Sequence, residues 1–247
     1  MRSVWFVTPA WKRVEVTRLA LAQRSQVAEA LVPLGLDVRS VVVADDENLD
    51  AAREYGCDVV ELDNDHGVGR RFNAGFEYAA EQGADLFVYL GSDDWLHPDA
   101  FAPIVEGEAD EGTIVTGREI AFVDLASGRL QACRYRTLHG PGFEHGIIPW
   151  IFPREVLEPV GFRPLPPKAP RGLDHLLTRA LTAAGVRPRW LFHDPPLGRV
   201  DFKSRVNLNG YARVARPLAR GPEVDAWPAL VEHYPAALVD MARDCPV

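Results

Sequence analysis

The first ninety residues of the chain alternate between two hydrophobic patterns. Short runs rich in β-branched and aromatic residues alternate with longer segments whose apolar residues recur at helical spacing. The strand-like runs are 3–7, 38–43, 59–62 and 86–90, and the helical segments are 15–31, 48–55 and 70–82. Strands that are joined through helices pair in parallel by right-handed crossovers. The pattern therefore predicts an α/β fold with a mostly parallel sheet and helices on both faces.

The pattern changes after Pro98. Two strand-like runs at 113–115 and 119–123 precede a turn at Ser127 and a further run at 130–135. Runs joined by such a turn predict a hairpin, and we expect this antiparallel element to join the sheet. The predicted sheet is therefore mixed.

The remaining chain begins with a region rich in glycine and proline, at 139–172. This composition predicts a long, shaped loop around one short helix at 154–158, and loops of that length in a compact domain tend to be functional. The later elements are expected to be a helix at 174–184, a strand at 190–192 and two helical pieces within 208–243, broken near Gly221.

The composition is that of a globular protein with an uneven charge. Hydrophobic residues make up 47% and charged residues 25% of 247 residues, near the usual averages. No run approaches the roughly 18 apolar residues of a membrane span, and three scattered cysteines indicate neither a disulfide framework nor a structural zinc site. We therefore expect a cytoplasmic protein without a membrane partner. The net charge of −8 argues against a stable nucleic-acid partner, although the basic region 118–220 could meet an anionic ligand.

An acidic loop follows the fourth strand-like run. Asp93 and Asp94 come directly after this buried run, at the end of the sheet where open parallel sheets bind ligands. Adjacent carboxylates in a partly dry site repel one another unless a cation neutralises them, and a hard ion such as Mn²⁺ or Mg²⁺ would do so. The alternative is that Ser92 to Asp94 only cap the turn into a helix at 98–101.

A glycine-rich run from Gly67 to Asn73 opens the third helical segment. Backbone N–H groups at a helix start, with Arg70 and Arg71 behind them, suit a phosphate or a sugar hydroxyl. The run is not the dinucleotide fingerprint, because Phe72 replaces its third glycine and the run follows the third strand. Neither a G-x-x-x-x-G-K-[ST] loop nor a G-x-S-x-G elbow occurs. The sequence therefore disfavours dehydrogenases, P-loop enzymes and α/β-hydrolases.

Two further candidates lie late in the chain. Asp174 begins a predicted helix after a proline-rich loop, where it could cap the helix or act as a base beside an acceptor. His193 follows the last predicted strand and could be an ordinary hydrogen-bonded histidine or a metal ligand. His139 and His145 lie in the glycine-rich region and are expected to be exposed to solvent.

Taken in order, these segments resemble nucleotide-sugar glycosyltransferases of the A-type fold, a Rossmann-like fold. The chain is similar to the large inverting family 2-like group of small bacterial and phage enzymes. The resemblance covers about residues 3–200 and rests on an ordered set of motifs: VTP at 7–9, ADD at 44–46, GVGRRFNAG at 67–75 and LGSDDWLHP at 90–98. Members of the family usually read Asp-x-Asp-Asp in the last motif, with the first Asp on the ribose and the next on the metal. Gly91 stands at the first position here, which leaves Asp93 as the implied metal ligand.

The resemblance also implies a donor site. Thr8 and Pro9 would line the pocket for the nucleotide base, and Asp45 would hydrogen-bond the edge of the base. Further residues implied to bind the nucleotide sugar are Gly69, Arg70, Asn73, Ser92 and Asp94.

Late residues complete the implied site. Asp174 matches the catalytic base of the family, although Leu173 stands where a Glu usually precedes it. His193 lies where some members carry a late metal or phosphate contact. The residues that would close over the diphosphate are Arg199, Lys203 and Arg205.

The implied activity is transfer of a sugar from a nucleoside-diphosphate sugar to an acceptor hydroxyl, with Mn²⁺ or Mg²⁺ as cofactor. Uridine diphosphate is the commonest donor nucleotide in the family. Inversion is expected, with retention open, and a protein side chain or glycan is favoured over lipid or DNA as the acceptor. We expect one α/β domain over 1–205, with a nucleotide-binding half at 1–100 and an acceptor half at 101–205. A C-terminal helical extension would follow at 206–247.

Two alternatives stay open. A non-catalytic module that binds nucleotide sugars or carbohydrates could share the fold, and Gly91 and Leu173 favour it because the family often has acids there. A sugar-phosphate nucleotidyltransferase shares the layout, but it would need a glycine-rich basic signature after the first strand, where Thr8 and Pro9 stand instead.

Overall fold

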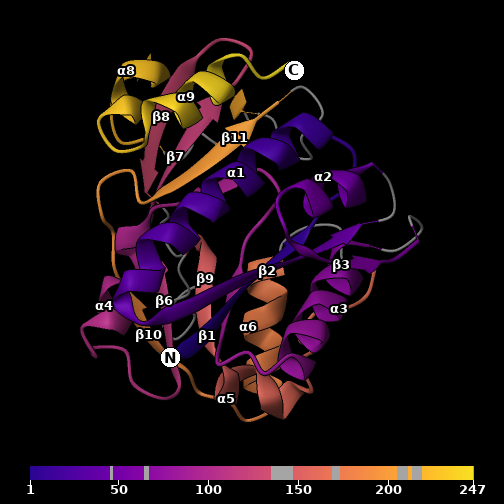
Figure 1. The fold of residues 1–247 in the computed structure, drawn as a ribbon. Helices are drawn as coiled ribbons and strands as arrows, with labels where there is room; N and C mark the ends of the chain where they lie inside the picture. Colours follow the sequence, from indigo (N-terminus) through magenta and orange to yellow (C-terminus); the bar gives the residue numbers. More distant parts are fainter. Residues whose placement is uncertain are drawn as a thin grey trace.

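The chain forms two β-sheets, and helices pack against both (Figure 1). The computed structural model describes residues 1–44, 47–63, 67–134, 147–168, 173–204, 211–212 and 219–246. The larger sheet has the strand order β10-β6-β9-β4-β1-β2-β3, and the smaller sheet has the order β12-β8-β7-β11-β5.

The larger sheet is mixed and mostly parallel, as predicted. Its strands are β1 (Arg2–Pro9), β2 (Leu36–Ala44), β3 (Asp58–Glu61), β4 (Leu86–Tyr89), β6 (Thr113–Gly117), β9 (Ile147–Pro153) and β10 (Arg189–Phe192). The four early strands pair in parallel in the order β4-β1-β2-β3, and β10 pairs in parallel with β6. Only β9 runs antiparallel to its neighbours in the described part of this sheet.

Strand β9 corrects the prediction of a long loop. The middle of the predicted loop at 139–172 forms this strand, which lies between β4 and β6 with Trp150 and Phe152 fully buried. The prediction failed because prolines were taken as loop residues. Pro149 lies where the register between β6 and β9 shifts, and such an irregularity tolerates a residue without an N–H donor.

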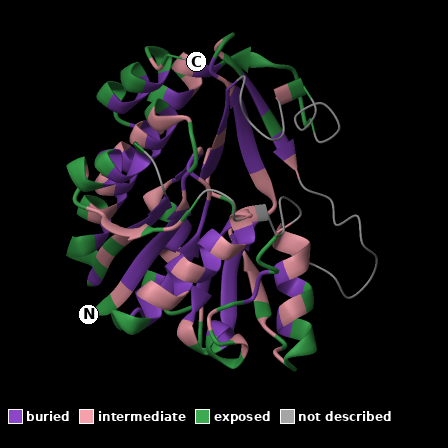
Figure 2. Cartoon of the chain, turned by 90° about the vertical axis from the view of Figure 1, so that its right-hand side faces the viewer, coloured by how far each residue is buried: buried purple, intermediate pink, exposed green. Residues whose placement is uncertain are grey.

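Helices cover both faces of the larger sheet and bury its central strands. The main helices are α1 (Val14–Leu31), α2 (Asn48–Glu54), α3 (Val68–Glu81) and α6 (Leu173–Ala183), with shorter α4 (Ala102–Val105) and α5 (Arg154–Leu157). Successive residues of β1 point to opposite faces. Phe6 therefore packs with Val27 of α1, whereas Val7 packs with Phe76 of α3. Figure 2 shows the buried residues concentrated along the strands and the inward faces of the helices.

The smaller sheet contains the predicted hairpin. Its strands are β5 (Asp94–Leu96), β7 (Glu119–Asp124), β8 (Arg129–Arg134), β11 (Arg199–Lys203) and β12 (Val224–Asp225). Strands β7 and β8 pair antiparallel as expected, but they join this second sheet and not the main one. That part of the prediction was wrong, because hydrophobic pattern specifies a hairpin but not the sheet to which it is added.

The C-terminal helices belong to the core of the smaller sheet. Helices α8 (Ala226–Val231) and α9 (Ala236–Arg243) confirm the helical prediction for this part, while Val224 and Asp225 form a strand instead. Leu238 of α9 is buried in one cluster with Trp95 of β5 and Val200 of β11. Among the described residues, no helix is both long and apolar enough to cross a membrane.

Candidate active site

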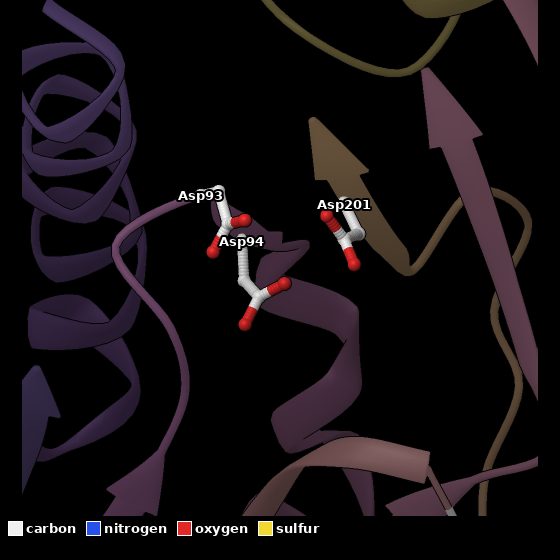
Figure 3. A group of neighbouring side chains, drawn as sticks. All are labelled: Asp93, Asp94 and Asp201. Carbon is white, nitrogen blue, oxygen red and sulfur yellow. The ribbon is translucent and has the colours of Figure 1, made fainter. Parts of the chain in front are cut away.

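Three carboxylates meet where the end of β4 approaches the smaller sheet. Figure 3 shows Asp93 and Asp94 facing Asp201, which lies on β11. One oxygen from each carboxylate lies within 4.8 Å of the others. Asp94 stands opposite Asp201 in the antiparallel pair of β5 and β11, and the N–H of Phe202 donates to the carbonyl oxygen of Asp93 at 2.9 Å. Backbone pairing between distant segments therefore builds the cluster.

The acids do not cap the following helical turn. The turn at Pro98–Phe101 has His97 as its cap, and the His97 side chain accepts from the N–H of Asp99. Asp94 is instead the first residue of strand β5. The capping alternative for the acidic loop is therefore wrong.

Two cations partly neutralise the cluster. The Nη1 of Arg13 lies 2.9 Å from the Oδ2 of Asp93, and its Nη2 donates to the hydroxyl of Ser92 at 3.2 Å. The Nζ of Lys203 lies 2.5 Å from the Oδ2 of Asp201 and 3.9 Å from the Oδ2 of Asp93. Lys203 therefore lies at the carboxylate cluster, and its expected contact with a diphosphate stays a prediction.

The backbone that presents Arg13 is strained. Lys12 and Arg13 both adopt the left-handed region, with φ of 55° and 51°, at about 1–2 kcal/mol per non-glycine residue. Arg13 directly precedes α1, and the side chain of Asn48 donates to the carbonyl of Lys12 at 3.2 Å. The surrounding contacts thus hold a costly turn that directs Arg13 onto the acidic loop.

Burial and mutual repulsion separate the pKa values of the carboxyl groups. Burial tends to raise the pKa of Asp93, but Arg13 and Lys203 outweigh it and lower this pKa below its usual value. Burial and the charge of Asp93 raise the pKa of Asp94 to about 7. Burial also raises the pKa of Asp201 well above its usual value. Burial and the closeness of three carboxylates therefore oppose full ionisation of the cluster unless a cation neutralises it.

The donor set fits a hard divalent cation. Mg²⁺ and Mn²⁺ prefer carboxylate oxygens, and one or two carboxylates with phosphate oxygens are a common arrangement for them. The Oδ1 of Asp201 is buried and accepts no hydrogen bond from the described part of the chain. Since a buried acceptor without a partner is costly, this oxygen favours a ligand that completes the cluster.

Sequence reasoning missed Asp201, although a weak signal was present. Val200, Asp201, Phe202 and Lys203 alternate apolar and charged residues, which is the pattern of a strand with one polar face. Side chains two residues apart on a strand share a face, so Asp201 and Lys203 point to the same side. Their alignment with β5 depends on pairing across a hundred residues and could not be read from the pattern.

Buried Arg24 joins the ends of β1 and β4. Its Nη1 donates to the hydroxyl of Thr8 at 2.5 Å, and its Nη2 donates to the carbonyl of Gly91 at 2.6 Å. Burial lowers the pKa of Arg24 to about 10. A Cβ at Gly91 would lie 2.7 Å from the Oδ1 of Asp93 and 2.9 Å from the Oδ2 of Asp94. A side chain at this position would therefore displace the carboxylates of Asp93 and Asp94 from where the structure places them.

The expected donor-binding residues divide into two groups. Thr8 and Pro9 end β1 close to the acidic loop, to which Thr8 is linked through Arg24. Asp45 lies outside the described residues, as do Arg205, His139 and His145.

The second group lies at the start of α3 and packs on residues 165–168. The amide of Asn73 donates to the carbonyl of Leu165 at 2.7 Å and accepts from its N–H at 3.1 Å. The N–H of Arg70 donates to the carbonyl of Pro167 at 3.3 Å. A Cβ added at Gly69 would clash with the carbonyl oxygen of Pro166. The polar atoms of Asn73 therefore hold two segments of the protein together.

Asp174 lies in the first turn of α6, as expected. Its Oδ1 accepts from the N–H of His175 at 2.9 Å. Burial raises the pKa of Tyr89, at the end of β4, and the carboxylates of Asp174 and Asp94 raise it further. The carboxylate cluster of the described residues does not include Asp174, whose assignment as the base stays a prediction.

His193 has a different environment. Its Nε2 lies 3.0 Å from the carbonyl oxygen of Asp99, and the carboxylate cluster of the described residues does not include it. The guanidinium of Arg199 is buried and donates to the carbonyl of His193 at 2.9 Å. Burial lowers the pKa of Arg199 to about 10. These contacts hold His193 and Arg199 to each other and to the turn at Pro98–Phe101.

Comparisons with known proteins agree with this architecture. Residues 26–148 match the family model described as Glycosyl transferase family 2. The chain is similar to the structure of S. aureus TarS 1–349, with 14% identity, a TM-score of 0.53, and coverage of 82% of this chain and 60% of that chain. It is also similar to TarS 1–349 in complex with UDP, with 15% identity, a TM-score of 0.53, and coverage of 83% and 61%.

These likenesses show the fold. The chain spans about three fifths of the length of these TarS structures. No curated protein sequence gave a significant match.

Proposed function

This chain is a family 2-like glycosyltransferase of the A-type fold, and from that premise we propose the reaction that its site performs. It transfers a sugar from a nucleoside-diphosphate sugar to an acceptor hydroxyl, with a divalent cation and with inversion at the anomeric carbon. The carboxylate cluster carries this proposal, together with the buried Oδ1 of Asp201, which accepts no hydrogen bond among the described residues. UDP is the proposed nucleotide, because a structure of similar fold was solved in complex with UDP.

The cluster and its cations would receive the diphosphate. Asp93, Asp94 and Asp201 would hold Mn²⁺ or Mg²⁺, which supplies Lewis-acid stabilisation of the negative charge on the leaving group. Arg13 and Lys203 add positive charge at the same place, since both contact the carboxylates. Positive groups placed where charge develops lower the barrier to departure of the diphosphate.

Asp174 is the proposed base. The acceptor hydroxyl oxygen forms a bond to the anomeric carbon while the bond from that carbon to the diphosphate oxygen breaks. The hydroxyl proton passes to a carboxylate oxygen of Asp174. Attack opposite the leaving group inverts the anomeric configuration.

The first experiment measures release of nucleoside diphosphate from a panel of nucleotide sugars with Mn²⁺, with Mg²⁺ and with chelator. We expect metal-dependent release from one donor, and loss of at least tenfold in the Asp93→Asn variant. Asp240→Asn is the matched control, because Asp240 is an exposed residue of α9 that pairs with Arg243. Release that is equal in chelator would contradict the metal-dependent reaction.

The proposed base is tested separately. Asp174→Asn should bind UDP with unchanged affinity in calorimetry and lose at least a hundredfold in transfer to the acceptor, since Asn cannot take the proton. A variant that transfers at the wild-type rate would remove Asp174 from the mechanism. Binding of a donor by the wild type without any turnover would instead favour the binding-module alternative.

A further inference from the structure

Lys203 places an ammonium inside the carboxylate cluster. Its Nζ lies 2.5 Å from Asp201 and 3.9 Å from Asp93, and only 9% of the side chain is exposed. Its Nζ also lies 5.5 Å from the centre of the Phe122 ring of the neighbouring strand β7. The ammonium therefore sits where it neutralises two of the three carboxylates.

A divalent cation in the cluster would bind the same carboxylate oxygens that this ammonium contacts. Three carboxylates meet two protein cations, Arg13 and Lys203, which leaves little negative charge in the cluster for a metal ion. A metal that bound beside Lys203 would meet a like charge at short distance in a buried site, where such repulsion is strong. Arg13 bonds the Oδ2 of Asp93 and the Ser92 hydroxyl, whereas Lys203 is the cation in direct contact with Asp201 among the described residues.

We propose that Lys203 is an internal counter-ion that competes with the divalent cation. In the free enzyme its ammonium neutralises the cluster and keeps metal affinity low. When the metal binds, the ammonium leaves Asp201, and a bound diphosphate offers it a new anionic partner. Because the displaced ammonium gains the diphosphate as a partner, bound nucleotide raises the affinity for the metal. The effect between two ligands is reciprocal, so bound metal raises the affinity for the nucleotide by the same factor. This inference rests on the proposed function.

The test measures Mn²⁺ affinity by calorimetry, with and without UDP, in the wild type and in Lys203→Met. We expect the variant to bind Mn²⁺ alone about tenfold more tightly than the wild type, and UDP to improve that affinity less than it does in the wild type. Lys168→Met is the matched control, because Lys168 is exposed and should leave Mn²⁺ affinity unchanged. Equal or weaker Mn²⁺ binding in Lys203→Met would overturn the inference.

A second measurement uses the wild-type protein and does not depend on the folding of a variant. The chain has only three lysines, Lys12, Lys168 and Lys203, so reductive methylation followed by mass spectrometry reports each one. Lys203 should be protected relative to Lys168 in chelator and become labelled several-fold faster with saturating Mn²⁺ and UDP. Unchanged labelling of Lys203 under conditions where calorimetry shows Mn²⁺ binding would overturn this inference but not the proposed function. Absence of Mn²⁺ binding with UDP present would overturn both the inference and the metal-dependent function.

Discussion

At the scale of single residues, the acidic loop places two carboxylates that repel one another in a buried site. Asp94 is buried beside Asp93, and its Oδ2 accepts from the N–H of Gly91 at 2.5 Å. Burial and the neighbouring charge raise the pKa of Asp94 to about 7, whereas an unfolded chain gives Asp about 3.9. The repulsion between these carboxylates is therefore a cost to folding, which the proposed cation would relieve.

This cost predicts a pH dependence of stability without metal. The folded state binds the Asp94 proton more tightly than the unfolded state, so the free energy of unfolding falls as pH rises from about 4 through about 7. Asn cannot ionise, so Asp94→Asn should flatten this fall when urea unfolding is measured in chelator at pH 4.5 and pH 7.5. The variant should also lose most of the stabilisation that Mn²⁺ gives the wild type at pH 7.5.

The control for this prediction is again Asp240→Asn, an exposed change that should keep the wild-type pH dependence. An Asp94→Asn variant with the same fall in stability as the wild type would show that Asp94 ionises freely in the folded protein.

At the residue scale, the sequence predicted site residues that are neighbours in the chain and missed partners that are far apart in it. Asp93 and Asp94 were found because they are adjacent and follow a buried strand-like run. Arg13 was missed, since only the left-handed turn at Lys12 and Arg13 brings it to Asp93, eighty residues away. Local pattern therefore identified the acids of the site but not the partners that neutralise them.

At the scale of elements, the start of α3 packs unusually close to another segment. Gly67 and Gly69 both lie against the backbone of residues 166–168. One turn later, the Asn73 side chain hydrogen-bonds both the carbonyl and the N–H of Leu165. The glycine-rich run was interpreted as a phosphate-binding start of a helix. Its glycines also permit this close approach, which orders the proline-rich segment that precedes α6.

We predict that Gly69→Ala lowers the free energy of unfolding by about 1–3 kcal/mol, the usual range for overpacking. The added Cβ would clash with a backbone carbonyl, which cannot turn away as a flexible side chain could. Urea unfolding measures the change, and Gly221→Ala is the control because nothing lies within 4 Å of its Cβ position and its φ is ordinary. Equal stability of the two variants would contradict the close packing at α3.

Elements were predictable where the pattern was local and repeated. The alternation of β1 to β4 with α1 to α3 is confirmed nearly to the residue, since each strand and helix carries its own periodicity. Strand β9 was missed because its prolines resemble a loop, and the hairpin of β7 and β8 was assigned to the wrong sheet. The first error concerns whether a strand forms, and the second concerns the sheet it joins; both outcomes depend on pairing across the whole fold.

At the scale of the molecule, the site lies between the two sheets. The acidic loop follows β4 of the larger sheet, and Asp201 lies on β11 of the smaller sheet. The other face of β5 and β11 is apolar: Trp95 contacts the rings of Phe202 and Tyr234, with centroids 4.6 and 4.9 Å away. The same apolar cluster contains residues of α1, α8 and α9. The C-terminal helices therefore support the strands that carry two of the three carboxylates.

This support predicts that a change in α9 weakens cation binding at the proposed, distant metal site. Leu238→Ala removes a side chain that is 1% exposed from the cluster around Trp95, at a cost of about 2–5 kcal/mol in stability. Because β5 and β11 lose part of their packing, the affinity of the folded variant for Mn²⁺ should fall together with its unfolding temperature. Met241→Ala changes the same helix at a residue that is 44% exposed and should alter neither quantity. A destabilised Leu238→Ala variant that still binds Mn²⁺ with wild-type affinity would mean that β5 and β11 hold their alignment without the C-terminal helices.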